Sequence, residues 1–104
     1  MKKTREECLE VLASLPESTP RKGEVWRHYK GGRYDVLHVV LSANDASLPI
    51  VVYRETWEMG KGHYEPLYWA RLLSEWTEWV WVVEPHDEGD IAYNGPRFVK
   101  EIEK

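Results

Sequence analysis

The sequence predicts a mainly β domain, either a small antiparallel barrel or a highly curved sheet, preceded by one short N-terminal α-helix. Two observations predict this fold. Five or six short segments rich in Val, Tyr and Trp occur in about 80 residues, and Gly, Pro and Asn punctuate them. A chain of 104 residues has the size of one domain. We therefore expect a single domain with a helix at 4–15, a linker at 16–24 and a β-barrel at 25–104.

The helix is predicted for Thr4–Leu15. Thr4 and Glu7 have the spacing of a capping box, in which each side chain accepts the other residue's backbone N–H. Pro16 ends the helix because its ring disfavours helical geometry at Leu15. One face of the helix is apolar and is made by Cys8, Val11, Leu12 and Leu15. Such a face is typical of a helix that docks on the rest of its domain.

Strands are predicted for Val25–Lys30, Tyr34–Leu41, Ile50–Glu55, Leu67–Arg71, Val80–Glu84 and Phe98–Ile102. Turn signals lie between them, including Gly31-Gly32, "PHDEGD" and Asn94-Gly95. The segment Leu72–Trp79 lacks clean alternation and has the pattern of a helical turn, for which Ser74 is the candidate cap.

Gly31-Gly32 raises the question of a phosphate loop against a hairpin turn. Neither a dinucleotide fingerprint nor a Walker-type motif is present, and no helix is predicted to follow. Two glycines between strands favour a two-residue type I′ turn, since both its central positions need positive φ. Counting from that turn places Tyr29 opposite Tyr34 and His28 opposite Asp35.

This register has chemical consequences. Asp35 opposite His28 could hold the imidazole protonated for contact with an anion, or the two could form a surface pair that only steadies the hairpin. Arg27 would face Val36 and Trp26 would face Leu37. Lys30 would lie opposite Arg33, a repulsive pair unless an anion lies there.

Charge and composition limit the classes of function. Net charge is −4, which argues against sequence-blind binding of nucleic acid. Charge is uneven, because Arg21 to Arg33 holds five basic residues and one acidic residue, whereas Glu55 to Asp90 holds nine acidic and two basic. A basic patch on an acidic chain suits a compact anion. No apolar run approaches the roughly 20 residues of a membrane helix, and neither a signal peptide nor an internal disulfide is expected, so we expect a cytoplasmic protein.

Four segments carry a family resemblance. "GEVWRHYKGGRYDVL" resembles the opening of the bacterial and phage domain-of-unknown-function family 1653. "IVVYRETW", "YWARLLSEWTEWV" and "NGPRFVKE" are similar to its later segments in the same order, from about Gly23 to Glu101. Leu72 departs from the family's usual Pro. The resemblance implies an SH3-like β-barrel and a bacterial or phage source, and it implies no established biochemical role.

The family motifs supply the candidate ligand-binding residues. Arginine forks suit carboxylates and phosphates, and Trp and Tyr faces suit stacking on a planar ligand. The alternative is that the arginines pair with Asp35, Glu75 or Glu78 and that the aromatic residues fill a small core. The candidates are His28, Tyr29, Lys30, Tyr53, Arg54, Trp69, Arg71, Trp76 and Arg97.

Catalytic and metal chemistry is not indicated. No base can be tied to Cys8, which lies on the apolar helix face, and His63 has no Cys or His at metal spacing. The acidic "HDEGD" segment lacks a calcium-loop pattern, and His38 within an apolar strand is expected to be a core or edge residue. We therefore expect no enzyme activity, no cofactor and no metal.

The sequence leaves three functions open. The first is a non-catalytic binding module for a small anionic, aromatic ligand such as a nucleotide. The second is an SH3-like protein- or peptide-interaction module with "WTEWVW" as its aromatic platform. The third is a nucleic-acid-associated domain using Arg21–Arg33, which the net acidity disfavours. The excess of aromatic residues also allows a homodimer.

Overall fold

The computed structural model describes residues 3–56, 66–86 and 89–101. The elements run in the order α1 (Arg5–Ala13), β1 (Val25–His28), β2 (Arg33–Leu41), β3 (Pro49–Glu55), β4 (Tyr68–Leu72), α2 (Leu73–Trp76), β5 (Trp79–His86), β6 (Gly89–Pro96) and β7 (Phe98–Lys100). The predicted mainly β fold with one short N-terminal helix is confirmed. The strands lie within a few residues of their predicted bounds, apart from β6, which was not predicted.

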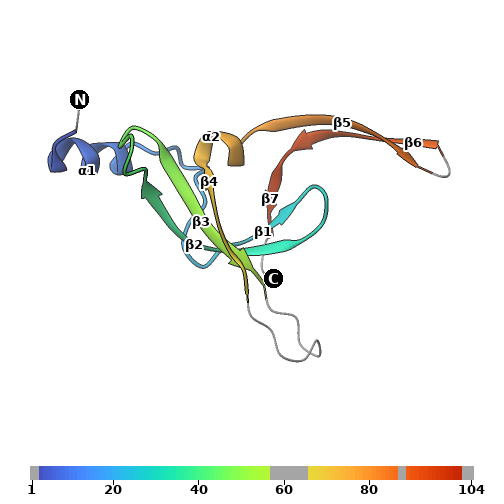
Figure 1. Ribbon diagram of the computed structural model, residues 1–104, viewed down its shortest axis with the longest axis horizontal. Coiled ribbons are helices and arrows are strands. Elements are labelled where there is room, and N and C mark those ends of the chain that lie inside the picture. The colour runs from blue at the N-terminus through green and yellow to red at the C-terminus, as the bar shows by residue number, and fades with distance from the viewer. Residues whose placement is uncertain (1–2, 57–65, 87–88, 102–104) are drawn as a thin grey trace.

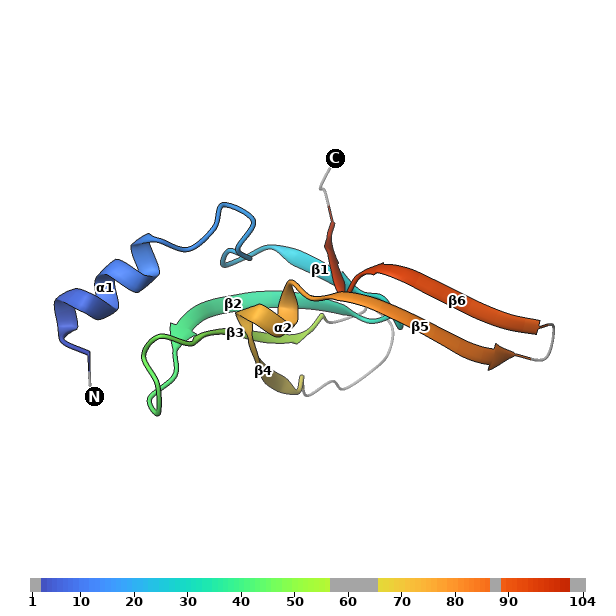
Figure 2. The ribbon, with the colours of Figure 1, turned by 90° about the horizontal axis from the view of Figure 1, so that it is seen from above.

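The strands form two antiparallel units (Figure 1). One is a five-stranded sheet with the order β4-β3-β2-β1-β7, and the other is a two-stranded ribbon of β5 and β6. Figures 1 and 2 show the ribbon extending away from the sheet, toward the side opposite α1. Within the described residues no ladder joins the sheet edges β4 and β7, so the sheet is open there and the closed barrel is not confirmed.

The hydrophobic core lies on one face of the five-stranded sheet. Alternate residues of β2, β3 and β7 point to this face, and α2 covers part of it. Trp76 of α2 is 1% exposed and stacks on Phe98 with a ring separation of 3.7 Å. Tyr53 meets the Trp76 ring edge-on at 5.0 Å. The buried cluster consists of Val36, Val51, Tyr53, Leu73, Trp76 and Phe98.

A β-bulge in β2 sets which residues of this strand point into the core. Val36 pairs with Tyr53 and His38 pairs with Val52, so Leu37 is left between two registers. The extra residue bends the strand and lets Val36 and Val39 both pack in the core although they are three residues apart. His38 was predicted to be a core or edge residue. It is exposed, so it is not a core residue.

The N-terminal helix is capped as predicted but is shorter than 4–15. The Thr4 hydroxyl accepts the Glu7 backbone N–H at 3.2 Å, and the Glu7 carboxylate accepts the Thr4 N–H at 3.0 Å. None of the helix residues is buried. Cys8 and Val11 are half-buried, and Leu15, just beyond the helix, packs against the core. The predicted docking face therefore makes only a partial contact, through its C-terminal end.

The second helix is the predicted helical turn after β4. Ser74 is not its cap, because Leu72 occupies the N-cap position and makes no capping hydrogen bond with its side chain. At the other end, the Thr77 hydroxyl donates to the Leu73 carbonyl at 3.1 Å. This single turn carries Leu73 and Trp76 over the core face of the sheet.

Candidate functional site

The β1–β2 hairpin does not have the two-residue turn that the sequence predicted. The strands pair Trp26 with Tyr34 and Arg27 with Arg33, a register three residues from the predicted one. The loop is wider, since the His28 carbonyl accepts the Gly31 N–H at 2.9 Å and the His28 N–H donates to the Gly32 carbonyl at 3.0 Å. Both glycines have a φ of 94°, as expected for glycine at a turn.

A shift by an odd number of residues moves side chains to the opposite face of a strand, so the predicted pairs are wrong. His28 lies on the core face opposite Phe98, whereas Asp35 lies on the outer face opposite Arg54. Tyr29 stacks on Tyr93 at 5.1 Å instead of facing Tyr34.

The core face ends in a concave site of about 330 Å³. The hairpin, β3, β4 and β7 all contribute to it, because β3 lies between β2 and β4 and β7 pairs with β1. Five of the nine candidate residues come together here, namely His28, Lys30, Tyr53, Trp69 and Arg71. Gly31, Tyr34 and Phe98 complete the lining. We call this site the aromatic pocket.

Arg71 is held over the rings of the aromatic pocket. Its guanidinium lies 5.8 Å from the centre of the Phe98 ring, and its Nε donates to the Tyr53 hydroxyl at 3.5 Å. Its Nη1 lies 3.9 Å from a carboxylate oxygen of Glu75. Both polar distances are at or beyond the usual limit of a hydrogen bond, and half-exposed ion pairs of this kind are weak. The guanidinium can therefore turn toward an anion at little cost.

His28 adds a directional donor to the aromatic pocket. Its Nδ1 accepts the backbone N–H of Lys30 at 3.1 Å, so the neutral imidazole carries its proton on Nε2. Burial lowers the pKa of His28, and the positive charges of Arg71, Arg97 and Lys30 lower it further. The interpretation in which Asp35 holds His28 protonated is wrong, because Asp35 lies on the other face of the sheet. The surroundings are electropositive, which favours an anion at this place.

The remaining candidates lie outside the aromatic pocket. Trp76 fills the core, and Tyr29 is half-buried against Tyr93. Arg54 pairs with Asp35 on the outer face at 3.4 Å, and Arg97 pairs with Glu78 at 3.2 Å. The three arginines therefore do not converge. Each has the carboxylate partner that the alternative interpretation gave it, and only Arg71 also reaches the aromatic pocket.

Sequence reasoning left Tyr34 and Phe98 out of the ligand-binding set, although both lie in the family motifs. The signal that could have found them is strand alternation in the correct register. Tyr34 faces Trp26, and Phe98 faces His28, so both point to the core face.

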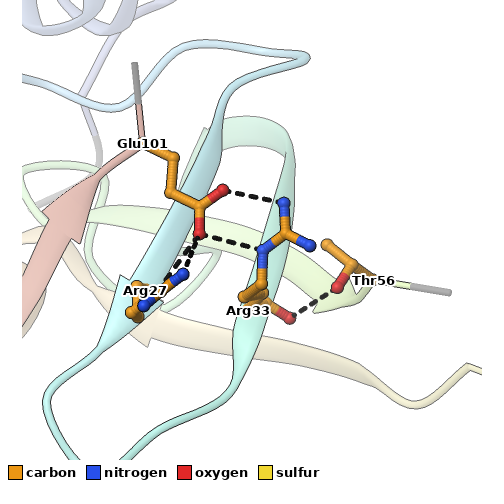
Figure 3. A network of polar contacts seen from close by, with 4 residues as sticks. All are labelled: Arg27, Arg33, Thr56 and Glu101. Atoms are coloured by element: carbon orange, nitrogen blue, oxygen red, sulfur yellow. Dashed lines mark hydrogen bonds and ion pairs between the residues drawn. The ribbon is translucent and has the colours of Figure 1, made fainter. Parts of the chain in front are cut away.

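The outer face of the hairpin carries a separate charge network, shown in Figure 3. Arg27 and Arg33 lie directly opposite each other, and the Glu101 carboxylate accepts from both. The Arg33 Nη2 lies 2.7 Å and the Arg27 Nη2 lies 2.9 Å from its oxygens. The Arg33 contact, and then the Arg27 contact, lowers the pKa of Glu101. The chain's own carboxylate thus neutralises part of the basic patch.

The described residues hold no group of three His, Cys, Asp or Glu side chains placed to bind a metal. Cys8 is a free, half-buried thiol. His63 and the side chains of the "HDEGD" segment lie outside the described residues. Within the described part of the chain, no helix has the length and apolar character needed to span a membrane.

An open antiparallel sheet with an aromatic pocket beside its core defines the chain as a mainly β protein with a candidate ligand site on the core face. Residues 24–100 match the model of the family described as "Protein of unknown function (DUF1653)", and the chain belongs to this family. The match covers the span of the four motif segments except its first and last residues, which confirms the resemblance. No curated protein and no solved structure matches the chain.

Proposed function

We propose that the protein is a non-catalytic binding module for a small anionic ligand with an aromatic ring, such as a nucleotide. The observation that carries this proposal is the aromatic pocket, where three basic side chains and the rings of four Tyr, Trp and Phe residues line one concavity. His28, Lys30 and Arg71 supply positive charge or N–H donors. The rings belong to Tyr34, Tyr53, Trp69 and Phe98. Flat apolar walls with a few polar groups are typical of small-molecule sites.

The aromatic pocket also limits the ligand's size. Its volume of about 330 Å³ is near the lower end of ligand sites, which run from roughly 300 to 1,000 Å³. One ring system with one anionic group fits such a volume better than a dinucleotide does. Trp69 is 46% exposed at the rim, so its indole can stack on the outer side of a bound ring.

Thermal-shift screening with nucleoside monophosphates, and with the same nucleosides lacking phosphate, tests the proposal. A ligand at about 100 times its Kd stabilises the folded state by about 2.7 kcal/mol. Phosphate-bearing members should raise Tm, Arg71→Gln should remove the shift, and Arg54→Gln should retain it. Arg54 is the matched control because it lies on the outer face, paired with Asp35. The absence of a shift with any member at millimolar concentration, or an equal loss in both variants, would refute the proposal.

A protein- or peptide-interaction module is the second candidate. Tyr68 and Trp69 are exposed on β4, which is an edge strand of the sheet, and Leu67 beside them is exposed as well. An edge strand can accept an extended peptide as an added strand. We propose the SH3-like barrel, which the family resemblance implies, together with this second candidate function.

We also propose that the protein is cytoplasmic, where a lone cysteine stays reduced.

A further inference from the structure

The ribbon of β5 and β6 presents an apolar face to solvent. Figures 1 and 2 show it projecting from the sheet. Cross-strand partners share a face, and the register pairs Trp79 with Pro96, Trp81 with Asn94, and Val83 with Ala92. Trp79, Trp81 and Val83 are 66%, 74% and 56% exposed. We call the face made by these six residues the ribbon face.

The opposite face of the ribbon is covered at its base. Val80 and Gly95 are buried there, and Tyr93 stacks on Tyr29 of the hairpin at 5.1 Å. The Tyr93 hydroxyl donates to the Pro96 carbonyl at 2.6 Å. The base is therefore anchored to the domain, and the tryptophans point away from that anchor. A two-stranded ribbon is marginal in water without such packing, so cover on its second face would stabilise it further.

The area of the ribbon face is large for a free surface. If a whole Trp side chain has about 250 Å² of surface, the exposed parts of Trp79 and Trp81 come to about 350 Å². With Val83 and the three cross-strand neighbours, the face reaches roughly 500 Å², near the upper end for a monomer. Two copies placed face to face would bury about 1,000 Å², which is the lower limit for a specific interface.

The chemistry of the ribbon face suits a second copy of this chain. None of its six residues is charged, although the chain carries a net charge of −4. Two acidic chains can meet at this face without bringing like charges into contact. The Trp79 indole N–H already donates to the Asn94 side chain of the same ribbon. Burial of this face would therefore leave the Trp79 donor satisfied.

We propose that the ribbon face joins two copies of the chain in an isologous dimer. Trp79, Trp81 and Val83 of one copy meet the same three residues of the other across a two-fold axis. None of the six residues lines the aromatic pocket, so the dimer and the ligand site are independent claims. An interface of this size is expected to dissociate with a micromolar or weaker Kd.

Light scattering coupled to size-exclusion chromatography tests the dimer, with the chain loaded from about 1 µM to about 1 mM. The mass should rise from monomer toward dimer across this range. Trp81→Lys, at the centre of the face, should raise Kd by at least about tenfold. Leu48→Lys is the control, since it adds the same charge at an exposed side chain in the β2–β3 loop.

Three results would overturn the proposal. One is a wild-type chain that stays monomeric at every concentration. Another is a Trp81→Lys variant that dimerises like the wild type, and the third is equal weakening by Leu48→Lys. Circular dichroism checks that each variant is folded. If Trp81→Lys is unfolded, Val83→Lys takes its place with the same expected loss.

Discussion

Substitution of Trp76 tests whether this residue has a structural role or a ligand-binding role. The sequence made it a ligand-binding candidate, and the structure places it in the core. It is 1% exposed, lies flat on Phe98 at 3.7 Å and meets Tyr53 and Trp26 edge-on. Replacing a buried Trp by Ala removes these contacts and leaves a cavity, at a cost of about 3–5 kcal/mol. A domain of this size has only about 5–15 kcal/mol of stability.

Trp76→Phe should be much milder. The indole N–H of Trp76 is buried without a hydrogen-bond partner among the described residues, so Phe removes an unsatisfied donor as well as some ring area. We expect a loss of about 1–2 kcal/mol for Phe against 3–5 kcal/mol for Ala. A Trp76→Ala variant that is much less stable than Trp76→Phe is what a core position predicts.

Urea unfolding followed by circular dichroism measures both losses at a concentration low enough to keep the chain monomeric. Trp81→Ala is the matched control, because Trp81 is 74% exposed and should change stability by no more than about 0.5 kcal/mol. A Trp76→Ala loss below about 1 kcal/mol would refute the assignment of this residue to the core.

Three further outcomes follow from the charges around the hairpin. Asp35→Asn should leave the pKa of His28 unchanged by NMR, whereas Arg71→Gln should raise it, because Arg71 is one of the charges that lower it. The pKa of His28 is lower in the folded state than the value near 6.5 of an unfolded His, so below pH 7 the unfolded state binds more protons. Acidification from pH 7 should therefore destabilise the wild type more than His28→Gln. Parallel pH dependences of the free energy of unfolding in the two proteins would contradict this. The ion pairs lower the pKa of Glu101, so Glu101→Gln should be less stable than the wild type at pH 7. At a pH below the folded pKa of Glu101, the two proteins should be equally stable. A difference in stability that persists in acid would exclude the ion pairs as its cause.

The register of the β1–β2 hairpin could not be predicted from the sequence, although the strands themselves could. Alternation located both strands, and positive φ at both glycines was correct. A Gly-Gly pair fits a two-residue turn and also the end of a wider loop, and local sequence does not distinguish them. The observed register places Arg27 opposite Arg33. Glu101 relieves their repulsion, and it lies 68 residues from Arg33 along the chain. Only tertiary structure reveals such a partner.

The strand β6 was missed for a different reason. Asn94-Gly95 is a turn signal, yet both residues lie inside the strand. A Cβ at Gly95 would lie 2.8 Å from the Tyr93 hydroxyl, because the Tyr93 side chain folds back over the glycine. Glycine in a strand can thus mark a close approach and not a turn.

The candidate site was half predictable. Motif residues supplied His28, Lys30, Tyr53, Trp69 and Arg71, and strand pairing brought them together. A core position for Trp76 and a carboxylate partner for Arg97 were foreseen only in the alternative interpretation. The sequence could not choose between the two interpretations, since both placements depend on where α2 packs. The β-bulge at Leu37 was equally hidden, because one extra residue leaves little trace in a run of apolar residues.

The most direct measurement of the central claim uses the indole N–H signals of the tryptophans in a ¹H–¹⁵N NMR titration with a nucleoside monophosphate. The proposal expects the Trp69 signal to shift with added ligand, while those of Trp79 and Trp81 on the ribbon face stay in place. Arg71→Gln should abolish the Trp69 shift, and Arg54→Gln should keep it. An unmoved Trp69 signal at ligand saturation, or shifts confined to the ribbon tryptophans, would contradict a ligand site in the aromatic pocket.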